Sequence, residues 1–239
     1  MNRTLDHHPS EQWDPRSVEQ YGVRRLASGA GVPTGFDADP TPRWWRGGPV
    51  LDQLDTGHCG GFGAANEAAA TPFRWQRIDD DFGHAYYYEI KDRRLDPWGR
   101  EDGTSSLAVA KLGVLRNIWD SYWWAQSVDD IWTGLGLGPM CFGLSWMTGM
   151  FTPDRQGFIH PTGQDEGGHF VCATGRSPNY KGKGPTVRIR QSWGKGHGVN
   201  GNVYIPLVEL GDLMLGRVSR WPGEGFVPVG RDCPVAVAA

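Results

Sequence analysis

Three short segments, in a fixed order along the chain, constrain this sequence more than any other feature. Residues 53–59 read Gln-Leu-Asp-Thr-Gly-His-Cys, residues 167–169 read Gly-Gly-His, and residues 191–194 read Gln-Ser-Trp-Gly. A cysteine attacks a carbonyl group as a thiolate, so it needs an imidazole or a helix N-terminus nearby and donors for the developing oxyanion. Cys59, His169, Gln53 and Gln191 are candidates for these groups, provided that the fold brings the three segments together.

Cys59 begins a segment that is predicted to be helical. Its alanine-rich end favours a helix, although each glycine near its start weakens the helix by about 1 kcal/mol. The thiol would then lie at the positive end of the helix dipole, after a turn formed by residues 55–57. Gln53 lies six positions before Cys59. Its side-chain amide and the Cys59 N–H are therefore candidates for a two-donor oxyanion hole.

These motifs resemble those of the papain-like cysteine peptidases. Residues 53–59 and the following helix resemble the nucleophile segment of that family, residues 167–171 its histidine-bearing strand, and residues 192–201 its tryptophan-glycine loop. Residues 102–105 resemble the wall of the substrate cleft. The resemblance extends over about residues 49–210, and shorter runs are most similar to phage-encoded, prodomain-poor members from actinobacterial viruses.

The resemblance implies an α+β fold, in which a helical lobe and an antiparallel β-barrel-like lobe flank a cleft that holds the active site. We expect residues 1–35 to form a poorly structured or draped arm and residues 36–239 to form the peptidase domain. Within it, the helical lobe is expected at about 50–136 and the β lobe at about 137–230. Helices are predicted over 85–91, over 105–117 and from 127, and strands over 140–146, 169–174, 186–192 and 202–205. Ser127 and Asp130 resemble a capping box.

The resemblance also implies a role for each matching residue. Cys59 would be the nucleophile, His169 its base and Gln191 the amide that orients the histidine. Gln53 would donate to the oxyanion, and Trp193 would shield the orienting amide from water. Contacts with substrate are implied for Gly103, Asp102 and Gly168. The implied reaction is acyl transfer to the thiol and needs no cofactor.

The chain departs from the family pattern at several positions. Gln191 stands where the family has an asparagine, and a misplacement of the imidazole by about 1 Å would cost on the order of 10²-fold in rate. Gly60 replaces a bulky aromatic residue and His197 replaces a tryptophan, so we expect the leaving-group side of the cleft to be wider and more polar.

The cysteines indicate a reducing environment. Thr56 occupies the place of a cysteine that forms a framework disulfide in the family. Cys141 and Cys172 lie in apolar, strand-like runs, where a buried thiol is the ordinary outcome. A reduced, intracellular setting fits this pattern best.

Composition argues against several other classes of protein. A formal net charge of −3 over 239 residues disfavours a nucleic-acid-binding protein. The sequence has no signal-peptide pattern and no long apolar run, so neither membrane insertion nor Sec export is expected. We expect the chain to be cytoplasmic at synthesis in a bacterial host, with association with a virion as a further prediction. No spacing typical of a metal site is present, and the twelve tryptophans are expected mainly in the core.

Three functions are compatible with this pattern. The first is a cysteine endopeptidase or related hydrolase that acts on a protein or peptide. The second is a catalytically weakened papain-like protein of a phage, with a structural or interaction role and virion proteins as partners. The third is a cell-wall peptide hydrolase, which digestion of purified peptidoglycan would distinguish from the first.

Overall fold

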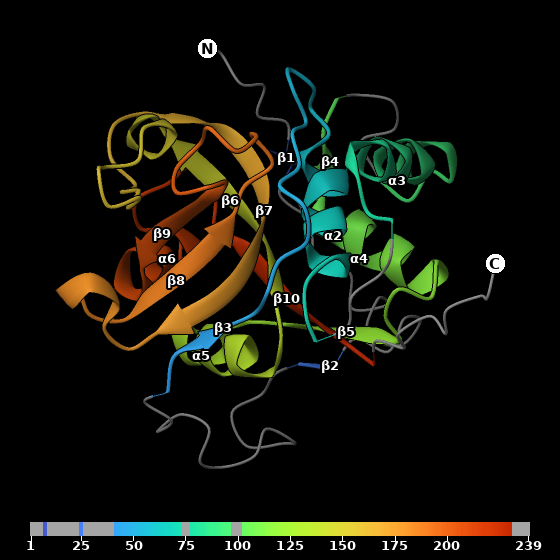
Figure 1. The fold of residues 1–239 in the computed structure, drawn as a ribbon. Helices are drawn as coiled ribbons and strands as arrows, with labels where there is room; N and C mark the ends of the chain where they lie inside the picture. Colours follow the sequence, from blue (N-terminus) through green and yellow to red (C-terminus); the bar gives the residue numbers. More distant parts are fainter. Residues whose placement is uncertain (1–6, 9–23, 26–40, 73–76, 97–101, 231–239) are drawn as a thin grey trace.

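A computed structural model of the chain describes residues 7–8, 24–25, 41–72, 77–96 and 102–230 (Figure 1). One lobe is mainly helical and the other is built on a largely antiparallel sheet, which confirms the predicted α+β class. The helical lobe contains α2 (Cys59–Ala68), α3 (Asp80–Asp92), α4 (Ser106–Leu115) and the short strand β4 (Thr104–Ser105). In Figure 1, α2 lies between the sheet and the other two helices.

The sheet follows the order β5, β10, β6, β7, β8, β9, with β3 beside β7. Its strands are β3 (Arg43–Trp44), β5 (Ser121–Trp124), β6 (Met140–Met147), β7 (Asp165–Ser177), β8 (Thr186–Arg190), β9 (Asn202–Pro206) and β10 (Glu224–Val229). Two helices belong to this lobe, α5 (Val128–Leu137) and α6 (Leu207–Met214), together with the 3-10 turns η2 (Thr148–Phe151) and η3 (Tyr180–Gly182).

Most predicted elements are present, with three differences. The predicted helices and the strands over 140–146 and 202–205 are confirmed to within a few residues at most ends. The strand predicted over 186–192 ends at Arg190, so Gln191 lies just beyond β8. The range of the predicted helical lobe, about 50–136, contains the strand β5, and the elements α6, β10, β3 and β4 were not predicted. Aromatic pairing explains β5, because Tyr122 and Trp124 both pack against Phe226 of β10.

Side-chain caps fix the start of three helices. Ser105 accepts a hydrogen bond from the N–H of Ala108 at 3.2 Å, and Asp79 caps α3 in the same way. Ser127 caps α5 as predicted, accepting from the N–H of Asp130 at 3.1 Å. The Asp130 carboxylate accepts from the N–H of Gln126 rather than from that of Ser127, so the predicted reciprocal capping box is displaced by one residue.

Each lobe has its own core. The cluster in the helical lobe includes Phe62, Tyr86 and Trp119, all fully buried. The cluster under the sheet contains Ile131 and Leu135 of α5, so this helix packs with the sheet although the predicted helical range includes it. The helix α2 lies directly on β7, because a Cβ atom at Gly63 would overlap the ring of Phe170.

Two short strands lie in the range predicted to be an arm. β1 (His7–His8) pairs in parallel with β4, and β2 (Arg24–Arg25) pairs in parallel with β5. The rest of the predicted arm lies outside the described residues. Over the described ranges, none of the helices combines the length and the apolar character that crossing a bilayer requires.

Candidate active site

Cys59 is the first residue of α2 and is fully buried. No side chain caps this helix. The carbonyl of His58, the residue before Cys59, accepts a hydrogen bond from the Phe62 N–H at 3.1 Å. The thiol therefore lies at the positive end of the helix dipole, which favours negative charge. The predicted helix start at Cys59 is confirmed.

His169 lies on β7, opposite Leu144 of β6, and is also fully buried. Its Nε2 atom lies 3.0 Å from Oε1 of Gln191. Because an amide oxygen only accepts hydrogen bonds, Nε2 carries the hydrogen and Nδ1 is the ring nitrogen that can take up a proton. The longer arm of Gln191 thus reaches the imidazole, and the structure brings this predicted pair together.

Two tryptophans surround the imidazole of His169. Trp193 stacks on it, with ring centroids 4.6 Å apart and an interplanar angle of 21°. Trp146 meets it edge-on at 4.9 Å, and Phe151 stacks on the far side of Trp193 at 5.7 Å. Trp146 was not among the predicted site residues, since β6 is buried along its whole length and shows no alternation to single out one position.

Gln53 links the two lobes. Its backbone N–H donates to the Ser192 carbonyl at 2.8 Å, and its Oε1 accepts from the Ser192 hydroxyl at 2.6 Å. One hydrogen of its Nε2 goes to the Thr56 carbonyl at 2.7 Å, which leaves the second hydrogen of the amide for another acceptor. Asp52 and Trp193 form an antiparallel bridge beside these contacts, so the loop before Cys59 is fastened to the segment after Gln191.

The predicted substrate-binding residues lie on two elements. Gly103 immediately precedes β4 and has a φ of 85°, in the left-handed region that favours glycine. Gly168 precedes His169 on β7 and pairs with Ser145. Asp102 is exposed and acts electrostatically on His58. The strand β4 is close to the nucleophile, because a Cβ atom at Gly60 would overlap the Thr104 side chain.

The structure shows what surrounds the two positions at which a wider cleft is expected. At Gly60, an added Cβ atom would overlap the Thr104 side chain and lie 3.0 Å from that of Val109. His197 lines a cavity of about 550 Å³ together with Trp193, Asp52 and Lys195. The width of the leaving-group side stays a prediction.

His58 belongs to a cluster of rings that the sequence did not indicate. Its Nδ1 lies 2.7 Å from Nδ1 of His84, and its ring stacks on Tyr87 at 4.0 Å. Burial, reinforced by His84 and opposed by Asp102, lowers the pKa of His58 to about 4. Within the described residues, no group of three or more His, Cys, Asp or Glu side chains could hold a metal ion.

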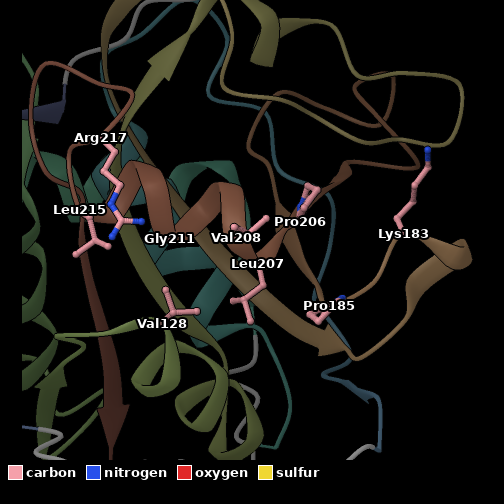
Figure 2. Close-up of a pocket in the computed structure, with 9 residues that line it drawn as sticks. All are labelled: Val128, Lys183, Pro185, Pro206, Leu207, Val208, Gly211, Leu215 and Arg217. Atoms are coloured by element: carbon pink, nitrogen blue, oxygen red, sulfur yellow. The ribbon is translucent and has the colours of Figure 1, made fainter.

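A second, apolar cavity of about 310 Å³ lies in the sheet lobe (Figure 2). Val128, Leu207 and Leu215 form part of its wall, with Lys183 and Arg217 toward opposite ends. None of the predicted site residues lines it. The candidate active site is defined instead by Cys59 at the start of α2 and His169 on β7, two elements that pack against each other.

No protein-family model and no curated protein matches the sequence. Solved structures match it well. Xylellain, a cysteine protease from Xylella fastidiosa, has a TM-score of 0.63 at 16% identity, over 97% of this chain and 99% of that chain. The proCathepsin B S9 from Trypanosoma congolense has a TM-score of 0.61 at 9% identity, over 96% and 86%. A recombinant stem bromelain precursor has a TM-score of 0.55 at 13% identity, over 88% and 75%. At these identities the likeness concerns the fold alone, and the chain has the α+β fold of the papain-like cysteine proteases.

Proposed function

We propose that this chain is a cysteine peptidase that hydrolyses peptide bonds in extended segments of a protein or peptide. The observation that carries the proposal is the 3.0 Å contact between His169 Nε2 and Gln191 Oε1. It fixes the tautomer of the imidazole, as an orienting amide must in a thiol-imidazole pair. The buried Trp193 covers this contact, which keeps water from competing for it.

The proposed reaction uses these groups. His169 Nδ1 takes the proton of Cys59, and the thiolate forms a bond to the carbonyl carbon of the substrate. The Cys59 N–H and the remaining Nε2 hydrogen of Gln53 donate to the oxyanion. The imidazolium returns the proton to the leaving amine as the C–N bond breaks. Water, deprotonated by the same imidazole, then attacks the thioester and the C–S bond breaks.

The strand β4 is the proposed edge for an extended substrate. The chain's own β1 pairs in parallel with β4 in this structure, so this edge supports main-chain hydrogen bonds, and an extended substrate would take the place of β1. Gly103 and Asp102 on this wall, and Gly168 on the other, are the proposed contacts for the residue before the scissile bond. The resemblance to phage-encoded members, and with it the association with virion proteins, remains a prediction from the sequence.

One observation favours a second candidate, a catalytically weakened protein with a structural or interaction role. Cys59 has no exposed surface, whereas a nucleophile must meet its substrate. This candidate and the peptidase predict different reactivity of the thiol toward reagents that label activated cysteines.

The test is intact-mass analysis after treatment with an epoxide that alkylates activated thiols. For a peptidase we expect one adduct on the wild type and none on Cys59→Ala. Cys172→Ala is the matched control, because it removes another buried thiol and should keep the adduct. A folded wild type without an adduct would favour the weakened protein. Digestion of casein and of purified peptidoglycan then separates a protein substrate from a cell-wall peptide.

A further inference from the structure

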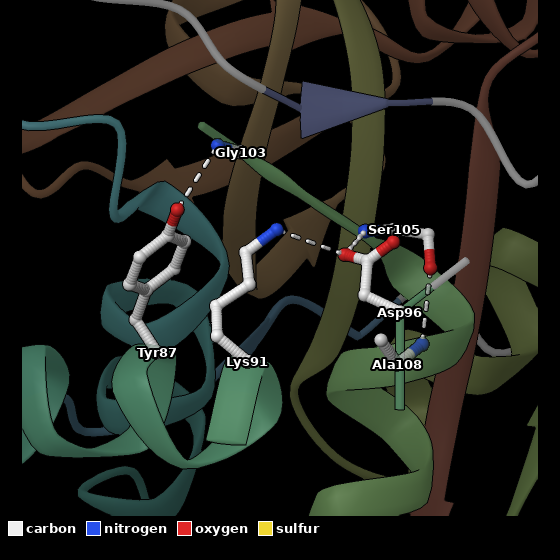
Figure 3. Close-up of polar contacts among 6 residues, drawn as sticks. All are labelled: Tyr87, Lys91, Asp96, Gly103, Ser105 and Ala108. Atoms are coloured by element: carbon white, nitrogen blue, oxygen red, sulfur yellow. Dashed lines mark hydrogen bonds and ion pairs between the residues drawn. The ribbon is translucent and has the colours of Figure 1, made fainter. Parts of the chain in front are cut away.

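Tyr87 contacts both sides of the nucleophile region from α3. Its ring stacks on His58, the residue before Cys59, at 4.0 Å and an interplanar angle of 19°. Its hydroxyl oxygen accepts a hydrogen bond from the N–H of Gly103 at 3.1 Å (Figure 3). One buried side chain therefore touches the turn that carries the thiol and the segment that enters β4.

The helix that carries Tyr87 cannot shift relative to the nucleophile helix. A Cβ atom at Gly61 would overlap the Gly83 carbonyl and would lie 3.0 Å from the Tyr87 nitrogen. The two backbones are thus in direct contact two residues after Cys59. Contacts this close constrain the position of the Tyr87 Cα atom against α2, because close-packed groups leave no free space for a shift.

β4 is held at its other end as well. The carboxylate of Asp96 accepts from the Ser105 N–H at 3.1 Å and lies 3.6 Å from the Lys91 ammonium (Figure 3). The same ammonium lies over the Tyr87 ring, 5.5 Å from its centroid. Tyr87 and Asp96 together fasten both ends of the segment that contains Thr104.

No disulfide supports this arrangement among the described residues, whose three cysteines are thiols. Thr56 occupies the position where the resembling family has a framework cysteine near the nucleophile. Here the contact between the His58 and His84 rings, at 2.7 Å, joins the nucleophile turn to α3 instead. The connection between the turn and β4 then passes through Tyr87.

We propose that Tyr87 is a positioning residue that sets the spacing between β4 and the thiol of Cys59. The inference rests on the proposed function, since the spacing matters only if an extended substrate pairs with β4 while its carbonyl meets the thiol. The hydroxyl holds the wall on which the substrate pairs, and the ring holds the turn that delivers the nucleophile.

The test compares two reagents that alkylate Cys59, with rates followed by intact mass. Iodoacetamide is small and needs the thiol alone, whereas a dipeptidyl epoxide also needs β4. In Tyr87→Phe we expect the rate with the peptidyl epoxide to fall about tenfold, because the buried Gly103 N–H loses its acceptor. The rate with iodoacetamide should stay within about twofold. For a fluorogenic peptide, KM should rise while kcat changes little.

Two further variants complete the design. Tyr87→Leu also removes the stacked ring, so both rates should fall. Tyr86→Phe is the matched control: it deletes a buried hydroxyl of the same helix, whose 2.7 Å bond goes to the Val109 carbonyl, and should leave the ratio of the two rates unchanged.

Equal losses of both rates in Tyr87→Phe, or no loss of either, would overturn the role of Tyr87. A wild type that reacts with both reagents at Cys59 but hydrolyses no peptide would contradict the proposed function. The ratio of the two alkylation rates in Tyr87→Phe would still test whether Tyr87 positions β4. A wild type that reacts with iodoacetamide and not with the peptidyl epoxide would contradict the assignment of β4, and with it the role of Tyr87.

Discussion

The turn that carries Cys59 and the strand that carries His169 are held in opposite ways. Around Cys59, glycines bring backbones and side chains into direct contact: Gly60 meets Thr104 and Gly61 meets Gly83. Around His169, the space is filled by the large rings of Trp146 and Trp193. Near Cys59, which we call the nucleophile side, the packing therefore leaves no room for added atoms. Near His169, which we call the base side, stability depends on large rings that fill the space.

Removing Trp146 should have the largest effect. Trp146→Ala leaves a cavity beside the imidazole, so we expect the free energy of unfolding to fall by about 3–5 kcal/mol. Urea denaturation measures this change. Trp221→Ala, at a ring that is 46% exposed, is the control and should change stability by less than about 1 kcal/mol. Equal effects of the two variants would contradict the contrast between the two sides.

Substitutions of Gln191 test the orientation of His169 while the surrounding tryptophan rings stay in place. In Gln191→Ala the Nε2–H of His169 loses its acceptor and the ring loses its orientation, so kcat should fall about 10²-fold, or roughly 2.7 kcal/mol. Gln191→Asn should also lower kcat, because the longer amide already makes a 3.0 Å contact. A variant with asparagine that is faster than the wild type would mean that glutamine holds the imidazole in a poorer position.

Adding one methyl group tests the nucleophile side. Gly61→Ala places a carbon against the Gly83 carbonyl and should destabilise the fold by about 2 kcal/mol. Gly196→Ala is the matched control, because nothing lies within 4 Å of the new carbon, and its effect should be below about 0.5 kcal/mol. If Gly61→Ala were as mild as Gly196→Ala, the contact between α2 and α3 would be looser than described.

The last expected effect is a dependence of stability on pH through His58. Its pKa is about 4 in the folded chain and 6.5 as a model value, so the unfolded chain takes up the proton first. This contribution to stability is complete above pH 6.5 and is lost as pH falls toward 4. His84, Asp102, Tyr87 and Tyr88 are the titratable groups facing the ring.

Thermal unfolding measured between pH 4 and 7 checks this expectation. The slope of the melting temperature against pH should be smaller in His58→Gln than in the wild type. An unchanged slope in His58→Gln would show that other groups carry the pH dependence.

The sequence predicted the parts of the site that lie in local motifs. The helix start at Cys59, the strand of His169 and the cap at Ser127 all depend on residues within a few positions of one another. It did not predict Trp146 or the cluster of His58, His84 and Tyr87. Their roles arise from contacts between residues 23 to 47 positions apart, on strands and helices whose burial has no period that marks one residue.

The strands β10 and β5 were also missed from the sequence, because contacts distant in sequence determine them. Pro228 disfavours a central strand, and the four-residue run of β5 sits within a helical stretch of sequence. Pairing between the two strands and the packing of Phe226 against Tyr122 decide their structure. Tertiary contacts of this kind override local preference.

The link between Gln53 and Ser192 has a consequence for how a substrate arrives. The lobes cannot swing apart like a hinge without breaking the two hydrogen bonds at 2.6 and 2.8 Å that also hold the Gln53 amide in place. For the proposed peptidase, the spacing between the segment before Cys59 and the segment after Gln191 therefore stays nearly constant while a substrate is bound and cleaved. A substrate of the proposed peptidase would have to bind as an extended stretch of chain, so we expect compact proteins to be cut at loops or tails.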